Sequence, residues 1–268
     1  MTLLVDKIIL ITGSTTGIGA AIARECVSQG AKVMLHGRSQ ARAKALSDEL
    51  GDSAAYILED LHEVSAAKKL INATVKQFGR IDGLVNNAAD LTRSDIDNLD
   101  EETFERMMTV NVKLPLFLIQ AAVQQFRQQP QKGTIVNIGS LNAYCGETAL
   151  LTYSMTKGAL MTMTRNLGDA FGPEGIRVNQ LNVGWTLTEN ESELKKTHGF
   201  PDDWESLIPE EFAPTGKLMH PENIAHHVGF WLSNLSAPSS GQVYEVEQYP
   251  VIGRNFINRI QLDSESHQ

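Results

Sequence analysis

Short apolar runs alternate with longer amphipathic stretches along most of the chain. The runs are rich in β-branched residues, as strands are, and the stretches between them have the length and periodicity of helices. The strands are predicted at residues 7–13, 31–37, 54–60, 81–89, 133–140, 176–184 and 241–247. Helices are expected at 17–29, 39–50, 63–78, 101–128, 150–171 and 221–235.

A strand that is apolar over its whole length is typical of a sheet covered by helices on both faces. The alternation of such strands with helices predicts an α/β fold with one domain that spans residues 1–268. Within it we expect a Rossmann-like, doubly wound parallel sheet of about seven strands.

Two segments fall outside this alternation. The polar insertion at 189–217 contains three prolines, and we expect it to form a lid over the carboxyl ends of the strands, where ligands bind in such sheets. Its apolar residues either wall a pocket or pack a core of the lid itself: Leu194, Phe200, Trp204, Leu207, Ile208 and Phe212. The tail at 248–268 folds over either a neighbouring subunit or its own surface.

Composition excludes some functional classes. The chain has 268 residues, is 42% hydrophobic and carries a net charge of −9, so we expect a sizeable core and no surface for a nucleic-acid backbone. No apolar run approaches the roughly 20 residues that span a bilayer, and the N-terminus has neither the basic region nor the cleavage site of a signal peptide. The chain is therefore expected to be cytoplasmic, to bind no membrane and to carry free thiols at Cys26 and Cys145.

A glycine-rich turn, "TGSTTGIGAAIA", follows the first predicted strand and precedes a helix. Glycine allows a tight turn and close backbone approach, and a helix N-terminus offers unpaired N–H groups to a pyrophosphate. The alternative is a purely structural connection between strand and helix. The candidate dinucleotide-binding residues of the turn are Gly13, Thr15, Thr16, Gly17, Ile18 and Gly19.

The end of the second strand favours NADP as the cofactor, with NAD also possible. In "HGRS", Gly37 stands where NAD-binding proteins use a carboxylate, and the guanidinium of Arg38 suits the 2′-phosphate of NADP. The alternative for Arg38 is a solvated loop residue.

The third and fourth strands end in further candidate cofactor ligands. Asp60, in the pair Asp60 and Leu61, either accepts a hydrogen bond from the adenine amino group or caps the next helix. Asn87 and Ala88 of "NNAA" either contact the cofactor or tie down a turn, and one sequence can serve both purposes.

Tyr153 and Lys157, in "TYSMTKGAL", stand four positions apart on a predicted helix, so both side chains point into one volume. Alone, such a pair is common in helices in which the lysine stem covers the ring.

Together, "TGSTTGIG", "NNAA", Asn111, Ser140 and "YSMTK" stand in the order and spacing of the short-chain dehydrogenase/reductase family, which the chain resembles over residues 6–247. The resemblance implies that Tyr153 is the general acid or base, that Ser140 bonds the same substrate oxygen and that Lys157 bonds the nicotinamide ribose. Asn111 would hold a kinked helix and a water that connects the lysine to solvent. Lys157 and an oxidised nicotinamide are expected to lower the phenol pKa from its ordinary value of about 10.

The loop after the sixth strand, "NVGWTLT", departs from the family's Pro-Gly because Val183 replaces the proline, while Gly184 is kept. Thr188 has the spacing of the family's threonine that contacts the nicotinamide carboxamide, and Thr186 lies in the same loop. Asn179 on the strand itself is either a structural amide or a ligand.

These features predict an oxidoreductase that prefers NADP and interconverts a carbonyl and a secondary alcohol of a small molecule. The alternatives are a redox sensor or scaffold without turnover, and an enzyme that uses the same residues for epimerisation or dehydration. Trp185 and the "LNAYCGE" turn are candidates for the substrate pocket. The resemblance implies a homodimer or homotetramer. No metal is expected, because His226 and His227 are consecutive on a helix and face different directions.

Overall fold

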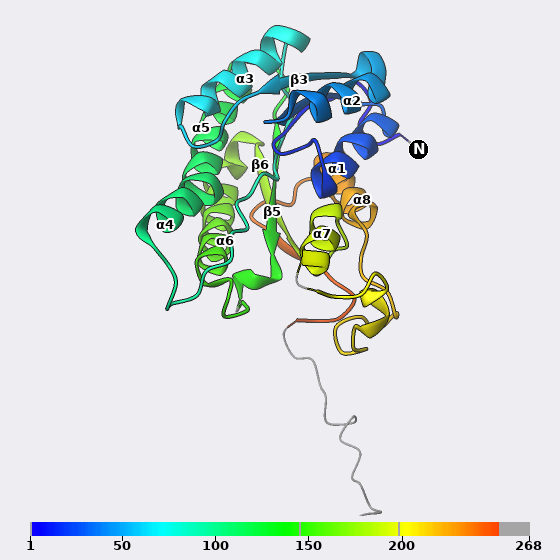
Figure 1. Ribbon diagram of the computed structural model, residues 1–268. Coiled ribbons are helices and arrows are strands. Elements are labelled where there is room, and N and C mark those ends of the chain that lie inside the picture. Colours follow the sequence, from blue (N-terminus) through cyan, green and yellow to red (C-terminus); the bar gives the residue numbers. More distant parts are fainter. Residues whose placement is uncertain (1, 145, 198, 252–268) are drawn as a thin grey trace, which may run out of the picture.

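The computed structural model describes residues 2–144, 146–197 and 199–251. At its centre is a sheet of seven parallel strands in the order β3-β2-β1-β4-β5-β6-β7 (Figure 1). The strands are β1 Ile8–Ile11, β2 Lys32–Gly37, β3 Ala54–Leu58, β4 Gly83–Asn86, β5 Thr134–Ser140, β6 Arg177–Val183 and β7 Val243–Val246. The chain starts in the middle of the sheet, winds to one edge and then to the other, which confirms the predicted doubly wound α/β fold.

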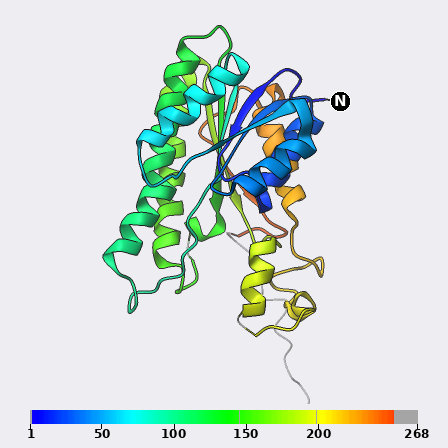
Figure 2. The ribbon, with the colours of Figure 1, turned by 45° about the horizontal axis from the view of Figure 1, so that its top comes forward.

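Helices cover both faces of the sheet (Figure 2). One layer contains α1 Gly17–Ser28, α2 Gln40–Leu50 and α8 Pro221–Leu232. The other contains α3 Ser65–Phe78, α4 Glu101–Met108, α5 Leu114–Arg127 and α6 Leu151–Phe171. Successive strand residues face opposite layers, so Ile9 and Ile11 join the core under α1 and α8, whereas Leu10 joins the core under α3 and α5.

The predicted helix at 101–128 is continuous but changes its pitch. α4 passes through a π-helical turn, Thr109–Lys113, into α5, and Asn111 lies in that turn. Such turns are rare and are found often at functional sites. By length and composition alone the stretch Glu101–Arg127 could cross a membrane, but 56% of its most apolar window is buried inside the protein, as in a core helix.

A row of buried polar side chains joins α6 to β4, β5 and β6. Asn86 Nδ2 donates to Asn137 Oδ1 and Asn137 Nδ2 donates to Thr164 Oγ1, both at 2.8 Å. The Thr164 hydroxyl donates to Gln180 Oε1 at 2.9 Å, and Gln180 Nε2 donates to Asn182 Oδ1 at 2.7 Å. None of these side chains is more than 4% exposed. The row fixes the position of the helix that carries the predicted catalytic pair.

The insertion at 189–217 begins with α7 Glu189–Thr197, a helix that the sequence pattern did not indicate, and lies beyond the carboxyl ends of the strands (Figure 1). The insertion and its flanking residues form a small core around Trp204, Ala213 and Leu218, against which Trp185 and Ile208 pack. Three apolar residues of the insertion are exposed: Phe200, Leu207 and Phe212. Packing around this small core therefore explains why Trp204 and Ile208 are apolar. The predicted tail lies outside the described residues beyond position 251.

Candidate active site at the carboxyl ends of the strands

The glycine-rich turn joins β1 to α1 and needs left-handed backbone at two positions. The φ angle is +61° at Gly13 and +51° at Gly17, a region that favours glycine. Thr16 directly precedes α1 with extended backbone, while Thr15 and Ile18 are half-buried. The turn therefore presents the N-terminus of α1, with its unpaired N–H groups, at the carboxyl end of β1.

Gly19 lies where no side chain fits. A Cβ atom there would lie 2.5 Å from Asn87 Nδ2 and closer still to the Gly13 carbonyl oxygen. Asn87 Nδ2 donates to the carbonyl oxygens of Thr12 and Gly13, both at 3.0 Å. A Cβ atom at Gly13 would lie 2.9 Å from Ala88 Cα. Asn87 and Ala88 therefore tie down the turn, and the close packing requires glycine at positions 13 and 19.

Arg38 and Asp60 follow the neighbouring strands β2 and β3. Arg38 is exposed and forms no hydrogen bond or ion pair with any other residue that the structure describes. Burial raises the pKa of Asp60, but hydrogen bonds from His62 and the charge of Arg38 outweigh it, so the pKa lies below its usual value. α3 begins only at Ser65, so the prediction that Asp60 caps this helix is wrong. Leu61 is buried in the core under α3.

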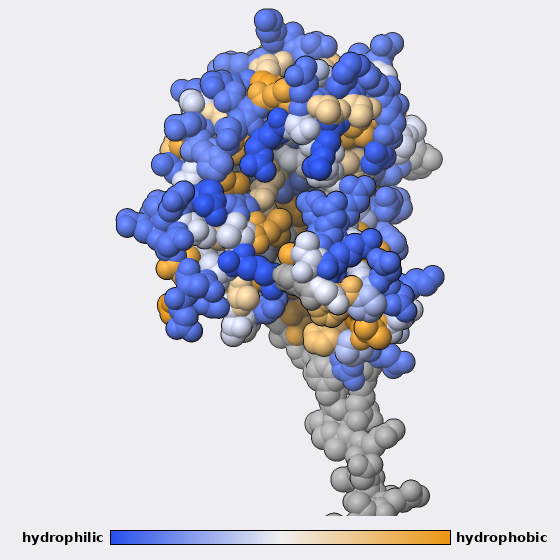
Figure 3. Space-filling model, in the orientation of Figure 1, coloured by the Kyte–Doolittle hydropathy of each residue, from blue (hydrophilic) through white to orange (hydrophobic). Residues whose placement is uncertain are grey.

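Ser140, Tyr153 and Lys157 converge at the end of β5. Their exposed fractions are 8%, 7% and 3%, and Ser140 is hydrogen-bonded to the Tyr153 hydroxyl. Lys157 Nζ lies 5.4 Å from the centroid of the Tyr153 ring and donates to the Ile138 carbonyl oxygen at 2.7 Å. The structure therefore brings the predicted serine, tyrosine and lysine together. Figure 3 shows the molecule hollowed between the side of α4 and α6 and the side of α7.

Burial, and not the charge of Lys157, dominates the pKa of Tyr153 in the protein without cofactor. Burial raises the pKa of Tyr153 to about 12, although the hydrogen bond from Ser140 acts in the other direction. Burial also lowers the pKa of Lys157 to about 8. The Lys157 ammonium donates to a backbone carbonyl and lies over the ring of Tyr153, so the cost of removing a phenolate from water outweighs its effect.

Asn111 connects the catalytic helix to the loop after β4. Its Oδ1 accepts from Asp90 N at 2.7 Å, and its Nδ2 donates to the Asp90 carbonyl oxygen at 2.9 Å and to Thr156 Oγ1 at 3.1 Å. Thr156 directly precedes Lys157, and the carboxylate of Asp90 forms an ion pair with Arg106. Both the oxygen and the nitrogen of this amide therefore hold the loop after β4 and the helix α6 in place relative to each other.

The loop after β6 closes over the glycine turn. Glu247 Oε2 accepts from Trp185 N at 3.2 Å, and a Cβ atom at Gly184 would overlap this carboxylate. Thr186 donates to the Gly184 carbonyl oxygen at 3.1 Å. The methyl group of Thr188 lies 3.5 Å from where a Cβ at Gly17 would be, and its hydroxyl accepts from the first turn of α7. Thr188 therefore joins the glycine turn to the lid.

Two residues of the site were not predicted. Glu247, at the end of the seventh strand, holds the loop after β6, and no local pattern distinguishes it from a surface glutamate. His36, the first residue of "HGRS", was assigned no role, yet it holds the glycine turn, and its place directly before Gly37 and Arg38 was the available signal. Asn179 bonds the backbone at Ser239 and Gln242, as the structural alternative predicted.

The remaining candidates lie apart from this site. His226 is exposed near Glu25, and the ring of His227 lies against Tyr244. Across residues 2–144, 146–197 and 199–251, the structure places no three His, Cys, Asp or Glu side chains together as a metal site would need. Cys26 is a buried free thiol whose pKa is raised by burial, and Cys145 lies outside the described residues.

Because the pKa of Lys157 is lowered, the free energy of unfolding should change with pH in the alkaline range. Between about 8 and 10.5 the unfolded chain holds this proton and the folded protein does not, so the free energy of unfolding rises with pH. The slope should approach about 1.4 kcal/mol per pH unit relative to a Lys157→Met variant. Urea unfolding of both proteins at several alkaline pH values measures it, and equal pH dependence in the two proteins would contradict the lowered pKa.

Comparison with known proteins agrees with this geometry. Residues 7–199 match the family model for short chain dehydrogenase. The chain is 31% identical to L-rhamnose 1-dehydrogenase (NAD(P)(+)) of Azotobacter vinelandii, over 89% of this chain and 94% of that protein. It is 30% identical to galactitol 2-dehydrogenase of Agrobacterium fabrum, over 90% and 96% of the two chains. It is also 29% identical to 3-alpha-(or 20-beta)-hydroxysteroid dehydrogenase of Mycobacterium bovis, over 93% and 91%.

The fold, the serine, tyrosine and lysine at the end of β5, the glycine turn and these similarities lead to one conclusion. The chain belongs to the short-chain dehydrogenase/reductase family of oxidoreductases.

Proposed function

We propose that the protein is an oxidoreductase that prefers NADP and interconverts a carbonyl and a secondary alcohol of a small molecule. The observation that carries this proposal is the convergence of Ser140, Tyr153 and Lys157 at the same edge of the sheet as a glycine turn that leads into the N-terminus of α1. Two paths of contact connect the turn and the three side chains. One runs through the loop after β4 and Asn111, and the other through the loop after β6 and Thr188.

The residues at the turn fit a dinucleotide. A Cβ at Gly13 would meet Ala88 and one at Gly19 would meet the Gly13 carbonyl oxygen, so glycine at both positions keeps the turn tight at the N-terminus of α1, whose unpaired N–H groups could hold a pyrophosphate. When bound, the nicotinamide gives a hydride to the substrate carbon or takes one from it. We assign the remaining contacts to Arg38 for the 2′-phosphate, Asp60 for the adenine, Lys157 for the ribose, and Thr186 and Thr188 for the carboxamide.

Tyr153 moves the proton in this proposal. A pKa of about 12 keeps the phenol protonated near neutral pH, and a protonated phenol can donate to a carbonyl oxygen. Ser140, already bonded to the phenol, orients the same substrate oxygen. In the oxidation direction, the positive charge of Lys157 stabilises the phenolate.

Cofactor preference is tested at Arg38. Replacing Arg38 by alanine should weaken NADPH binding by about 10-fold to 100-fold, because a charge-assisted contact to the 2′-phosphate is lost. The dissociation constant of NADH should stay within about twofold, since NADH has no such phosphate. Fluorescence titration measures both constants, and Arg127→Ala, an exposed arginine on α5, is the matched control. Equal losses for the two cofactors would show that Arg38 does not select between them.

Turnover separates the proposed enzyme from a sensor that only binds dinucleotide. The purified protein should oxidise NADPH with at least one compound in a panel of ketones, aldehydes and keto sugars, or reduce NADP with the matching alcohols. Two of the similar proteins are named for a sugar and a polyol, so these compounds belong in the panel. Product analysis distinguishes reduction from epimerisation or dehydration. Tight NADPH binding without turnover on any compound would favour a sensor.

We also propose that the protein forms a homodimer or homotetramer in the cytoplasm. An apolar groove between α5 and α6 supports this assembly, and it is lined by Leu116, Ile119, Val123, Leu167 and Phe171. Light scattering coupled to gel filtration measures the mass of the assembly directly.

A further inference from the structure

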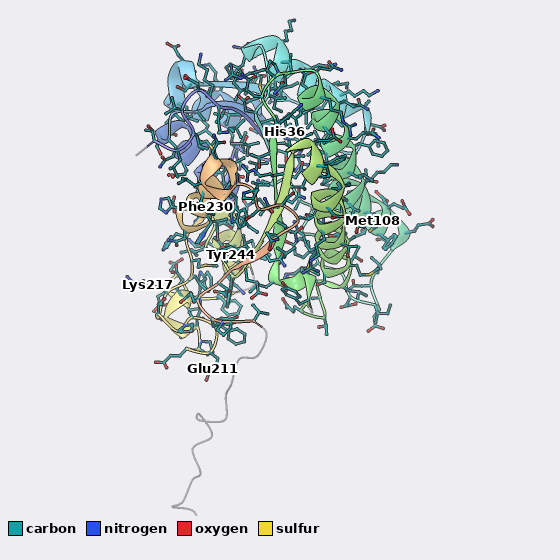
Figure 4. The ribbon with its side chains drawn as sticks, turned by 180° about the vertical axis from the view of Figure 1, so that it is seen from behind. His36, Met108, Glu211, Lys217, Phe230 and Tyr244 are labelled. Atoms are coloured by element: carbon teal, nitrogen blue, oxygen red, sulfur yellow. The ribbon has the colours of Figure 1, made fainter. Side chains whose placement is uncertain are left out.

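His36 joins three segments of the candidate cofactor site. Its backbone N donates to Ser14 Oγ at 2.8 Å, and its carbonyl oxygen accepts from Ser14 N at 2.9 Å. Its ring Nδ1 accepts from Gly13 N at 3.0 Å, and its Nε2 lies 3.0 Å from the Glu59 carbonyl oxygen. The residue is 2% exposed and lies in the interior between the two helical layers (Figure 4). One side chain therefore holds the glycine turn, β2 and the end of β3 together.

The partners of the ring determine its protonation. The Gly13 N–H group can only donate, so Nδ1 carries no proton. The Glu59 carbonyl oxygen can only accept, so Nε2 carries one. The imidazole is therefore neutral and in a single tautomer. An imidazolium would have N–H groups at both nitrogens and could not accept the hydrogen bond from Gly13.

The residues next to His36 make its position important for a ligand. A Cβ at Gly37 would lie 2.6 Å from the Thr15 methyl group, so β2 is packed directly against the glycine turn. Arg38 follows at the surface, and Asp60 follows Glu59 at the end of β3. Any movement of the His36 ring therefore changes the spacing between the turn and these two charged side chains.

We propose that His36 is a positioning residue for the dinucleotide and that its protonation releases the glycine turn and weakens dinucleotide binding at acid pH. This inference rests on the proposed function, because it takes the glycine turn as the dinucleotide site. Loss of the acceptor leaves the half-buried Gly13 N–H group without its partner, and the turn must move to find another.

The charges around His36 set the pH range of the effect. Glu59 is paired with Lys69 and Asp60 with His62, while Arg38 directly follows β2, the strand of His36. The Gly13–Ser14 segment adds only neutral groups. Burial lowers the pKa of His36 below its ordinary 6.5, and the two carboxylates oppose this only in part. The imidazolium therefore forms at a lower pH than that of an ordinary histidine, so binding should weaken only toward acid pH.

The test measures the affinity for NAD between about pH 5 and pH 8 by calorimetry, a range that spans the titration of histidine. NAD is the probe because it lacks the 2′-phosphate, which itself titrates near pH 6. The dissociation constant should rise by about tenfold toward the acid end, the value of one lost hydrogen bond. His36→Asn keeps an acceptor oxygen but cannot titrate, so its profile should be flat. His226→Asn, at an exposed histidine on α8 that lies apart from the candidate site, should keep the wild-type profile.

Each outcome bears on the proposal in a different way. The same acid weakening in His36→Asn as in the wild type would overturn it. If the protein binds no dinucleotide at any pH, the proposed function fails instead. The inference about His36 is then tested by nitrogen NMR of the free protein. A ring with its proton on Nε2, whose titration moves the Gly13 amide signal, supports it, and a proton on Nδ1 overturns it. This measurement also replaces the variant if His36→Asn does not fold.

Discussion

Replacing Tyr153 by phenylalanine should lower kcat by at least about 100-fold, because it removes the group that exchanges a proton with the substrate oxygen. The ring remains, so the packing of Lys157 over it is kept. The dissociation constant of NADPH should change little, because the lost hydroxyl is bonded to Ser140 and not to the glycine turn. Steady-state kinetics on a substrate found in the panel, together with fluorescence titration of NADPH, measures both quantities.

A matched control is Tyr244→Phe, which removes a hydroxyl from an exposed tyrosine on β7. Its turnover should equal that of the wild type. Wild-type turnover in Tyr153→Phe would remove this residue from the reaction. A loss of turnover accompanied by an equal loss of NADPH binding would mean that the substitution disturbs the cofactor site and says nothing of proton transfer.

Replacing Gly19 by alanine should change the shape of the turn and so weaken dinucleotide binding. The new methyl group would meet the Gly13 carbonyl oxygen and the amide of Asn87, so the backbone that faces the pyrophosphate must move. Affinity for NADPH should fall by about 10-fold to 100-fold, as expected for the loss of one charge-assisted hydrogen bond. The free energy of unfolding should fall by about 1–3 kcal/mol, the usual cost of overpacking. Fluorescence titration and urea unfolding measure the two effects.

Gly229→Ala, within α8, provides the comparison for Gly19→Ala. A Cβ there would lie 3.6 Å from the nearest atoms of Glu25, which is ordinary contact, so the substitution should be neutral or stabilising by up to about 1 kcal/mol. If Gly19→Ala binds NADPH as tightly as the wild type does, the turn has more freedom than the contacts of Asn87 allow, and the dinucleotide must bind elsewhere.

The sheet and its helices could be predicted because strand pattern and helix pattern are local properties of the sequence. The run Ile8–Ile11, for example, is apolar throughout, as is typical of a strand in a sheet buried on both faces. The convergence of Ser140 with Tyr153 could be predicted only through family resemblance, since no local pattern places residue 140 beside residue 153. The helix α7 was not indicated because its residues are mostly charged and few of them are buried.

The protonation of the site could not be predicted from the sequence. The direction in which the pKa of Tyr153 shifts depends on how completely the phenol is buried and on which group Lys157 hydrogen-bonds. Both depend on the tertiary structure. The same holds for Glu247 and His36, whose partners lie 62 and 23 residues away along the chain. Side chains that bond distant backbone groups leave no periodic signal.

The polar row that crosses from Asn86 to Asn182 limits how this protein can be recombined with its relatives. Hydrogen bonds are directional, so α6 has one favourable height and rotation on the sheet, whereas an apolar contact of the same area would tolerate sliding. A chimera that receives α6 from a protein without Thr164 would leave Asn137 and Gln180 buried without their partner. The exchangeable unit in such a chimera is therefore α6 together with β5 and β6, and not the helix alone.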